Sequence, residues 1–343
     1  MSAQLAILQP GLQTTVQDLG RTGFQAYGVP VCGALDSMAL RLANALVGNA
    51  TGAAALEIRL LGPVFEVAGG PLRMALTGAQ ADIEVTIGGE TQRYGAWRAI
   101  DVPDGARVRI GALTGSGCAV LAVAGGIDVP PVLGSRSTDL KGGFGGHEGR
   151  ALMAGDRLNV NIPNALGPCL ALPSLAGAAG EVTLRAVPGP QADAFTEAAL
   201  ATFFSAPYRV SREADRMGLR LEGPALGFRG GADIVSDGIV TGAVQVPGSG
   251  LPILLLADHQ TIGGYAKIAT VISADLPLAG RLVPGSTLRF QAVNVVQAEE
   301  ARRAAEAELQ RLLATLAPVR ESGRIDIAAL YDANLISGVT SGV

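Results

Sequence analysis

The sequence predicts a mainly β protein made of two related β units, with a few helices at their edges. Short β-branched runs alternate with turns rich in the chain's 47 glycines and 19 prolines, a pattern typical of a β-sandwich or β-barrel. The length of 343 residues suits two domains better than one. Motifs of the first half recur in order in the second half, which indicates duplication of one β unit.

The predicted strands are runs of apolar residues bounded by turn-forming residues. They cover Arg73–Leu76, Ile83–Ile87, Arg107–Ile110, Ala119–Ala124, Val182–Ala186, Ile253–Ala257 and Ile268–Ile272. Gly88-Gly89 follows one of these runs, and a Gly-Gly pair favours the tight turn of a β-hairpin.

Three helices are predicted. Asp36 is placed to cap a helix over residues 37–47, and Gly48 is placed to end it. Gln191–Phe204 is a weaker second candidate. Ala298–Leu316, rich in Ala, Glu and Arg, is the third, with Glu299 and Arg303 spaced to pair at i,i+4.

The internal repeat defines the predicted domains. Its matches are Pro10-Gly11-Leu12-Gln13 with Pro188-Gly189-Pro190-Gln191, Tyr27 and Asp36 with Tyr208 and Asp215, residues 59–63 with residues 220–224, and residues 155–158 with residues 285–288. We therefore expect a first β domain with a helical insertion over residues 1–165 and a second β domain over residues 181–295. Residues 163–180 would link them, and residues 296–343 would form a C-terminal helix and a loosely attached tail.

The composition argues against several classes of protein. A net charge of −4 without a basic cluster, and an aromatic content of 4%, argue against nucleic-acid binding. No apolar run approaches the ~18 residues that a membrane span needs, and the first residues lack the pattern of a signal peptide. Three widely spaced cysteines suggest no disulfide framework and a reduced cytoplasmic location. Two histidines, His147 and His259, make a histidine-rich metal site unexpected.

The familiar catalytic motifs are missing from the sequence. There is no Walker A loop, no HExxH and no GxSxG. A Cys–His nucleophile pair stays open, although no cysteine has a charged sequence context. Residues 135–143, which combine small polar groups, charges and glycines, are interpreted as an anion-binding loop that uses backbone N–H groups or, equally, as a flexible surface loop.

The stretch from Ser236 to Asp275 is the best candidate for a small-molecule site. Polar groups are costly among apolar residues unless something satisfies them, and this stretch sets eight of them between apolar runs and glycines: Asp237, Gln245, Asp258, His259, Gln260, Thr261, Tyr265 and Lys267. The alternative is a set of structural side chains bonded to the backbone.

Individual residues of this stretch have predicted roles. His259 follows an apolar strand and is a candidate acid, base or hydrogen-bond donor. Lys267 is the only cation between Gly231 and Gly280, so it is a candidate for holding a carboxylate, carbonyl or phosphate, or else a snorkelling surface side chain. Tyr265, two residues earlier on the same predicted strand, would point to the same face.

Long segments of the chain resemble the KipA family of biotin-dependent carboxyltransferase-like proteins, also called allophanate hydrolase subunit 2 or the C subunit of 5-oxoprolinase. They are PGLQTTVQDLGRTGFQAYGVPVCGALDSMALRLANALVGN, GGFGGHEGRALMAGDRL, PGPQ, DRMGLRLEG and Ser236–Asp275. The resemblance extends roughly from Leu5 to Gln291. His147 departs from the family pattern, in which an apolar residue is more familiar after GGFGG.

The resemblance implies two cyclophilin-like β-barrel domains. It also implies a partner, the KipI-like subunit, and a frequent third component, the LamB/YcsF-like subunit, together with a small amide substrate. The leading hypothesis is therefore the C subunit of an ATP-dependent 5-oxoprolinase, which opens 5-oxo-L-proline to L-glutamate. ATP would be used by the assembled complex, at a site not located in this chain, and the isolated chain would then lack activity.

Two alternatives stay open. One is a carboxyltransferase component that moves a carboxyl group from carboxybiotin to urea or a related amide, with biotin carried by another protein. The other is a non-enzymatic regulator that binds a KipI-like inhibitor of a histidine kinase. Both urea and 5-oxoproline present an amide carbonyl, which suits a site rich in amide and cationic donors.

The site hypothesis comprises ten residues of both halves. The catalytic candidates are His259, Lys267 and Gln260. The substrate-binding candidates are Tyr265, Thr261, Gly263, Gly264, Asp36, Arg41 and Lys141. Asp36 is also interpreted as a helix cap, and Arg41, Glu57 and Arg59 as a charge network that bounds a cleft or lies on the surface.

Overall fold

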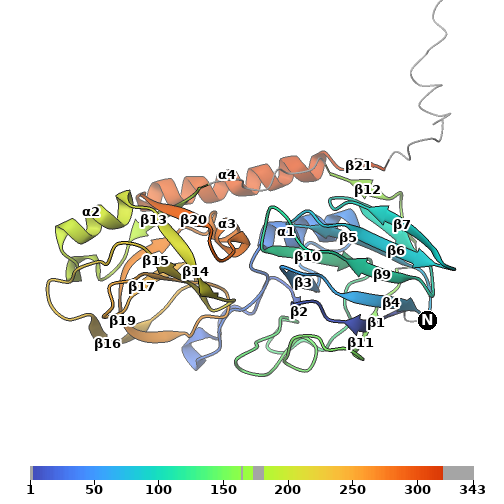
Figure 1. The fold of residues 1–343 in the computed structure, drawn as a ribbon, viewed down its shortest axis with the longest axis horizontal. Helices are drawn as coiled ribbons and strands as arrows, with labels where there is room; N and C mark the ends of the chain where they lie inside the picture. Colours follow the sequence, from blue (N-terminus) through green and yellow to red (C-terminus); the bar gives the residue numbers. More distant parts are fainter. Residues whose placement is uncertain (1–2, 164, 173–180, 320–343) are drawn as a thin grey trace, which may run out of the picture.

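Two β units lie side by side in the computed structural model, which describes residues 3–163, 165–172 and 181–319 (Figure 1). The prediction of a mainly β protein with few helices is confirmed. The longest helix, α4 (Val295–Ala314), runs along both units. Most of the predicted tail and much of the predicted linker fall outside the described residues.

The first unit consists of two antiparallel sheets. One has the order β11 (Arg157–Val160), β1 (Ala3–Gln9), β4 (Val64–Ala68), β9 (Arg107–Ile110), β6 (Ile83–Ile87) and β7 (Glu90–Tyr94). The other has the order β2 (Gln13–Gln17), β3 (Ala55–Arg59), β10 (Cys118–Val123), β5 (Leu72–Thr77) and β8 (Ala99–Val102). An isolated bridge between Ile127, which follows β10, and Val160 of β11 links the two sheets, whose inner faces share one apolar core.

The predicted hairpin at Gly88-Gly89 is confirmed. Ile87 pairs with Glu90 across β6 and β7, which leaves the two glycines as the turn. Both have positive φ, +59° and +88°. A type I′ turn needs this conformation at both central positions, and glycine adopts it without steric cost.

The second unit is one sheet that closes on itself. Its order is β13 (Val182–Pro188), β20 (Thr287–Ala292), β14 (Tyr208–Ala214), β15 (Gly218–Glu222), β18 (Ile253–Leu255), β17 (Ala243–Val246), β19 (Ile262–Val271) and β16 (Asp233–Gly238). An additional pairing between β13 and β19 closes the ring, so β16 alone stands outside it as an edge strand.

The two units differ in how their corresponding strands pair. In the predicted duplication, the motif matches make β1 correspond to β13 and β11 correspond to β20. In the first unit β1 runs antiparallel to β11, whereas in the second unit β13 runs parallel to β20. The recurring motifs therefore mark similar places along the chain without identical strand pairing.

Capping residues mark where two of the helices begin. Asp36 accepts a hydrogen bond of 2.9 Å from the Ala39 N–H at the start of α1 (Ser37–Leu46), as predicted. The second predicted helix is divided into η2 (Ala192–Ala194) and α2 (Glu197–Ser205), because Thr196 caps a new helix start. The short α3 (Leu276–Arg281) was not predicted.

The segment just before the undescribed linker residues pairs with the segment just after α4. β12 (Leu170–Ala171) pairs with β21 (Ala317–Pro318), next to the end of α4. Arg41 of α1 and Glu306 of α4 form a two-bond ion pair at 2.7 and 2.8 Å. Both contacts fasten α4 to the first unit.

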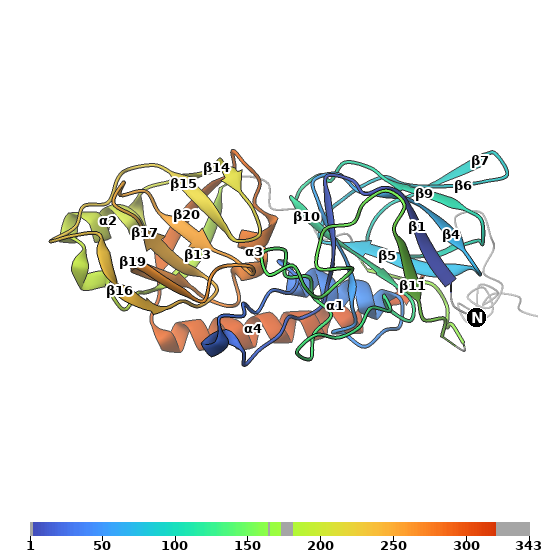
Figure 2. The same ribbon diagram turned by 90° about the horizontal axis from the view of Figure 1, so that it is seen from below.

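Segments of the first unit reach across to the second (Figure 2). The segment that holds η1 (Gln25–Tyr27) extends towards the second unit in both ribbon views. Downstream of it, the Cys32 N–H donates to the Ala257 carbonyl at 3.1 Å. Leu35 and Cys118 of the first unit belong to the apolar core of the second, so the units share packed surface.

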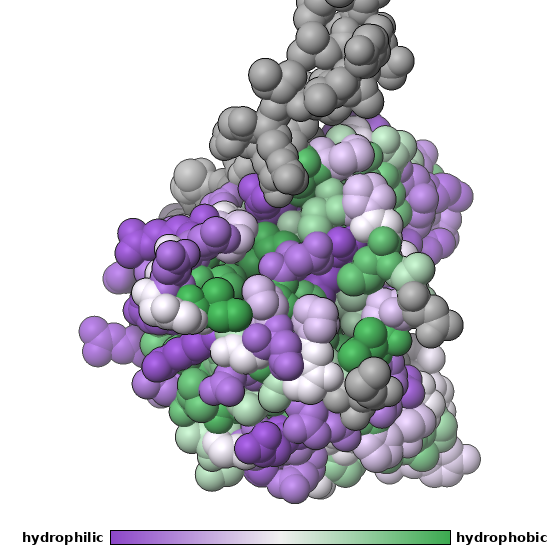
Figure 3. All heavy atoms as spheres, turned by 90° about the vertical axis from the view of Figure 1, so that its right-hand side faces the viewer, coloured by the Kyte–Doolittle hydropathy of each residue, from purple (hydrophilic) through white to green (hydrophobic). Residues whose placement is uncertain are grey.

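The surface at the outer end of the first unit mixes hydrophilic and hydrophobic residues (Figure 3). No helix among the described residues is long and apolar enough to cross a membrane.

Candidate functional site

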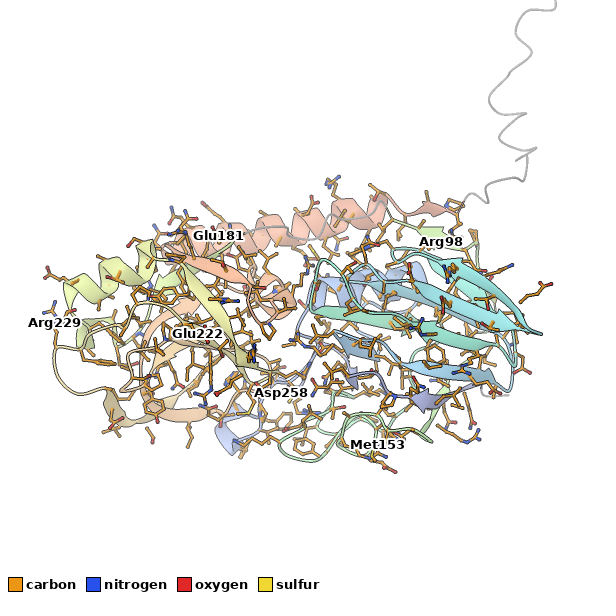
Figure 4. All side chains as sticks on the ribbon, viewed as in Figure 1. Arg98, Met153, Glu181, Glu222, Arg229 and Asp258 are labelled. Carbon is orange, nitrogen blue, oxygen red and sulfur yellow. The ribbon has the colours of Figure 1, made fainter. Side chains whose placement is uncertain are left out.

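The Asp258–Lys267 segment lies where the second unit meets the first. Asp258 follows β18 and lies near the middle of the molecule, between the two units (Figure 4). The chain turns at residues 257–258, and residues 259–261 then lead into β19. Seven of the ten predicted site residues lie between His259 and Lys267, so they are neighbours along this short segment.

His259 is buried and held in one tautomer. Its Nδ1 lies 2.6 Å from the Gln260 carbonyl oxygen, so Nδ1 carries the proton and donates. Its Nε2 is then the acceptor for the Thr241 hydroxyl at 3.1 Å. Burial lowers the pKa of His259, although the Gln260 carbonyl and the Asp258 charge act in the opposite direction. The imidazole is therefore neutral near pH 7 and presents a basic nitrogen.

The Lys267 side chain is buried, and its ammonium group contacts the edge strand β16. Its side chain is 4% exposed, and Nζ lies 2.7 Å from the Asp237 carboxylate, which is half-exposed. The bond to Lys267 also lowers the pKa of Asp237. The ion pair therefore links a buried side chain of β19 to a carboxylate at the surface.

A β-bulge sets the direction of the Lys267 side chain. Along the β17–β19 ladder, Val244 pairs with Ala269 but Gln245 pairs with Lys267, so Ile268 is the extra residue. The repeated motif at Gly189 packs on this bulge, where the Gly189 N–H donates to the Ile268 carbonyl at 2.8 Å.

Gln191 of the same motif ties the bulge to Asp237. Its Oε1 accepts from the Lys267 backbone N–H at 3.2 Å, and its Nε2 donates to Asp237 at 3.3 Å. Lys267 and Asp237 are thus connected through Gln191 as well as directly.

Gln245 adds an unpaired amide donor beside this group. The residue is 2% exposed, and its Nε2 has no hydrogen-bond partner among the described residues. Its Oε1 accepts from Gln260 Nε2 at 3.5 Å. A Cβ at position 263 would lie 2.8 Å from Gln245 Nε2, so Gly263 is required for this approach. Buried amide donors are normally satisfied, which makes Gln245 a candidate for binding a carbonyl oxygen.

Tyr265 and Thr261 lie near this group with different exposure. Tyr265 is 42% exposed, whereas Thr261 is buried. Tyr265 pairs with Asp233 of β16, and Gly263 pairs with Asp237. Gly264 lies between Gly263 and Tyr265. A Cβ added to Gly264 would only be in ordinary contact with the Ile234 carbonyl, so packing does not demand a glycine there.

A buried charge network joins this segment to the first unit. Arg216 donates to both Asp258 oxygens at 2.9 and 2.8 Å and to the Gly33 carbonyl at 2.7 Å. It also contacts Glu57 of β3, whose other oxygen accepts from the Leu35 N–H at 2.7 Å. Burial acts to lower the pKa of Arg216, but the two carboxylates raise it above its ordinary value, so the guanidinium stays charged.

The predicted residues of the first half do not join the Lys267 group. Asp36 caps α1 and pairs with Arg281 of α3 at 2.5 Å. Arg41 is held by Glu306 of α4. Lys141 is exposed in a loop, where its backbone N–H donates to Asp139.

The predicted network of Arg41, Glu57 and Arg59 is not formed. Each finds a separate partner, because these partners come from distant parts of the chain: Glu306, Arg216 and the Gly280 carbonyl, respectively. Two of the three contacts instead bind the first unit to the second.

Polar groups of residues 135–143, the predicted anion-binding segment, form hydrogen bonds with Asp18 and with one another. The Asp18 carboxylate accepts from the Ser135 and Ser137 hydroxyls and from the Arg136 N–H, each at 2.6 Å. Although burial acts to raise it, these bonds lower the pKa of Asp18. Asp139 accepts from the Gly142 N–H at 2.8 Å. These N–H groups are already used, so the segment is an ordered loop.

The cysteines do not form a nucleophilic pair with His259. Burial raises the pKa of the Cys32 thiol, and the Asp258 and Asp139 charges raise it further. Burial also raises the pKa of the Cys118 and Cys169 thiols. A thiol with a raised pKa is a poor nucleophile. No group of three potential metal ligands occurs among the described residues.

Five residues that build this region were not among the predicted site residues. Asp237, Gln245 and Asp258 lie in the polar stretch, where their residue types were the available signal. Gln191 lies in a motif of the internal repeat, and Arg216 lies in DRMGLRLEG, one of the segments that resemble the family; these were the signals for them.

Comparison with known proteins identifies the family. The model of the "Carboxyltransferase domain, subdomain A and B" matches residues 27–292. The chain is 40% identical to the 5-oxoprolinase C subunit of Escherichia coli over 301 residues, which cover 87% of this chain and 94% of that protein. It is 35% identical to the 5-oxoprolinase C subunit of Haemophilus influenzae, over 89% of this chain and 96% of that protein.

A solved structure agrees with these matches. The urea carboxylase of Kluyveromyces lactis superposes with a TM-score of 0.83 at 30% identity over 91% of this chain. The chain spans only 29% of that protein's length, so it corresponds to one part of that larger enzyme. The chain belongs to the family of the carboxyltransferase domain, subdomain A and B.

Proposed function

We propose that this chain is the C subunit of an ATP-dependent 5-oxoprolinase. Together with a KipI-like protein and a LamB/YcsF-like protein, it would open 5-oxo-L-proline to L-glutamate. The observation that carries the proposal is the 40% identity to the C subunit of a 5-oxoprolinase, of which the chain covers 94%. A relative matched over nearly its whole length supports a similar role better than a match to one part of a larger protein.

The geometry around Lys267 suits attack on a lactam. Ring opening breaks the amide C–N bond after water adds to the carbonyl carbon, and negative charge develops on the carbonyl oxygen. Lys267 Nζ and the unpaired Gln245 Nε2 are donors that would stabilise this charge. His259, kept neutral by burial, would accept a proton from water through its Nε2, released from Thr241, and would pass it to the ring nitrogen as the C–N bond breaks.

The other candidates have supporting roles in this proposal. Gln260 holds Gln245 through its side-chain amide, and its carbonyl fixes the His259 tautomer. Gly263 leaves room for the Gln245 amide. The chain contains no Walker A loop, so ATP is assigned to the complex, and no step of this chain is routed through it.

Reconstitution with all three subunits tests the proposal. We expect ATP-dependent formation of glutamate from 5-oxoproline, and Lys267→Met should lower kcat by about 10²–10³, the usual loss when one donor to a developing oxyanion is removed. Arg107→Met, which removes an exposed cation of β9, is the matched control and should retain activity. The absence of glutamate with all subunits present would refute the proposal.

The second candidate function is carboxyl transfer to urea or a related amide. Its support is the family description and the TM-score of 0.83 with a urea carboxylase. Urea-dependent loss of the carboxyl group from a carboxybiotinylated carrier, with formation of carboxylated urea and without 5-oxoproline turnover, would favour it. Binding to a KipI-like protein without any turnover, unaffected by Lys267→Met, would favour the regulatory alternative.

A further inference from the structure

A pocket of about 590 Å³ lies in the first unit, apart from the residues of β17 and β19 described above. The loop over residues 143–149 forms one wall, and Asp128, Arg157 and Asn159 contribute to the others. None of the pocket's lining residues belongs to the second unit. The proposed 5-oxoprolinase chemistry does not use them.

The loop presents a run of free backbone donors to this pocket. Within the described residues, the N–H groups of Gly145, Gly146, His147 and Glu148 have no hydrogen-bond acceptor, whereas the Gly149 N–H donates to the Gly145 carbonyl. Gly146 is buried, and a buried N–H without a partner is rare in proteins.

Three of these four residues have a left-handed backbone conformation. Gly145, Gly146 and Glu148 have positive φ, at +71°, +52° and +54°. Successive N–H groups in turns, or in alternating right- and left-handed conformations, form concave surfaces that bind anions, and residues 146–149 form such a turn. Glycine is needed at position 146, because a Cβ there would lie 1.9 Å from Thr138 Oγ1.

A buried guanidinium with an unused donor lies against the loop. Arg21 is 1% exposed and stacks on the Phe144 ring at 4.9 Å. A Cβ at Gly145 would lie 2.7 Å from Arg21 Nη2, so the guanidinium contacts the loop backbone directly. Its Nη1 is buried without a partner in the described part of the chain, and its other bonds go to carbonyl oxygens rather than to a carboxylate.

A second guanidinium lines the pocket itself. Arg157, at the start of β11, is exposed, and its side chain has no acidic partner among the described residues. Its charge is therefore available to a ligand in the pocket. The buried Arg21 and the exposed Arg157 together favour an anion at the loop.

The carboxylates of the pocket limit the charge of its ligand. Glu148 is paired with Arg150 at 2.5 Å, but Asp128 lines the pocket without a side-chain partner in the described structure. An uncompensated carboxylate in the same pocket disfavours a polyanion such as a triphosphate. One negative charge at the loop, bonded by N–H groups and Arg157, minimises that repulsion.

We propose that the residue 143–149 loop and Arg157 form a binding site for a small monocarboxylate. The carboxylate oxygens accept from the free N–H groups, and the Arg157 guanidinium forms a charge-assisted bond. The site does not depend on the proposed function, because it uses only residues of the first unit and needs neither the other subunits nor turnover.

Nuclear magnetic resonance of the full chain tests this site. The sequence has two histidines, so the imidazole of His147, which lines the pocket, is the reporter and that of His259 is an internal control. The probes are acetate, 5-oxoproline, inorganic phosphate and the neutral lactam 2-pyrrolidone, each added at constant pH and ionic strength. We expect saturable shifts of His147 with both carboxylates. Acetate, which has no lactam, should leave His259 unshifted, whereas 5-oxoproline, the proposed substrate at Lys267, should shift His259 as well.

Matched variants complete the test. Arg157→Gln should raise the Kd of both carboxylates about tenfold, which is the value of one charge-assisted bond. Arg107→Gln, which changes an exposed cation of the same sheet outside the pocket, should leave the Kd unchanged. An unshifted His259 resonance in each variant verifies that the fold is intact.

Three results would overturn the proposal. They are the absence of a saturable His147 shift with either carboxylate, a shift with 2-pyrrolidone as large as with 5-oxoproline, and tighter binding of phosphate than of acetate. The first would show that no ligand of this class binds, the second that the negative charge is not recognised, and the third that a phosphoryl group is preferred. Each leaves the 5-oxoprolinase proposal standing.

Discussion

Buried polar side chains of this protein fall into two kinds. Most have partners, as Asp18 and Arg216 do. A few are without them in the described structure, and Gln245 Nε2 is one. Because an unpaired buried amide is unfavourable, Gln245 is a better candidate for binding a ligand than a buried polar residue whose bonds are all made within the protein.

His259 should make the stability of the protein depend on pH in a defined direction. Burial lowers its pKa in the folded state, so between that pKa and about 6.5 the unfolded state binds more protons. The free energy of unfolding should therefore fall as the pH decreases below about 6.5, and His259→Gln should remove this contribution.

Urea unfolding at several pH values measures the effect, and the resonance of His259 gives its pKa directly. His147→Gln is the matched control, because His147 is the other histidine of the sequence. A folded-state pKa of His259 at or above the ordinary value would contradict the prediction.

Among the elements, the bulge in β19 connects the repeated motif to the site. A regular ladder would alternate the side chains of β19 strictly, and the extra residue Ile268 changes that order beyond Lys267. Gly189 lies against the bulge so closely that a Cβ would be 2.2 Å from the Lys267 carbonyl oxygen. The motif is therefore a packing element for the Lys267 backbone.

Gly189→Ala should displace this backbone and destabilise the protein by about 1–3 kcal/mol, the usual cost of forcing a methyl group into a packed site. It should also lower the activity of the reconstituted complex, because Lys267 moves. Gly227→Ala is the control, since a Cβ there would be 3.7 Å from its nearest neighbour and φ is not positive. Equal unfolding free energies for the two variants would disprove this role of Gly189.

In the molecule as a whole, charged groups hold the two units in one arrangement. Arg216 bonds to Glu57 and Gly33 of the first unit and to Asp258 of the second. Asp36 of the first unit pairs with Arg281 of the second at 2.5 Å. Because Asp258 directly precedes His259, the docking of the units and the position of the imidazole are connected.

Arg216→Met should destabilise the protein by about 3–5 kcal/mol, because it leaves two buried carboxylates without a counter-charge. Arg220→Met is the matched control, since Arg220 pairs with Glu213 on the exposed surface, and such pairs contribute about 0–1 kcal/mol. Urea unfolding of both variants measures the difference. A loss below about 1 kcal/mol for Arg216→Met would show that the network does not hold the units together.

Local structure was predictable from the amino-acid sequence alone. The Gly88-Gly89 hairpin and the Asp36 cap each depend on residues close in the chain, and so do most of the strand runs. The polar stretch around His259 and Lys267 was also visible, since polar residues between apolar runs need no distant information to be recognised.

Contacts between distant residues emerged only in the folded chain. Arg41 could not be assigned to Glu306, nor Glu57 to Arg216, because partners 265 and 159 positions apart leave no local pattern. The closure of the second sheet by β13 and β19, and the unpaired state of the Gln245 amide, likewise depend on packing. Hydrogen bonds between distant segments form only when the whole chain has folded. They show which polar groups have structural partners, such as the Arg41 guanidinium, and which have none among the described residues, such as Gln245 Nε2.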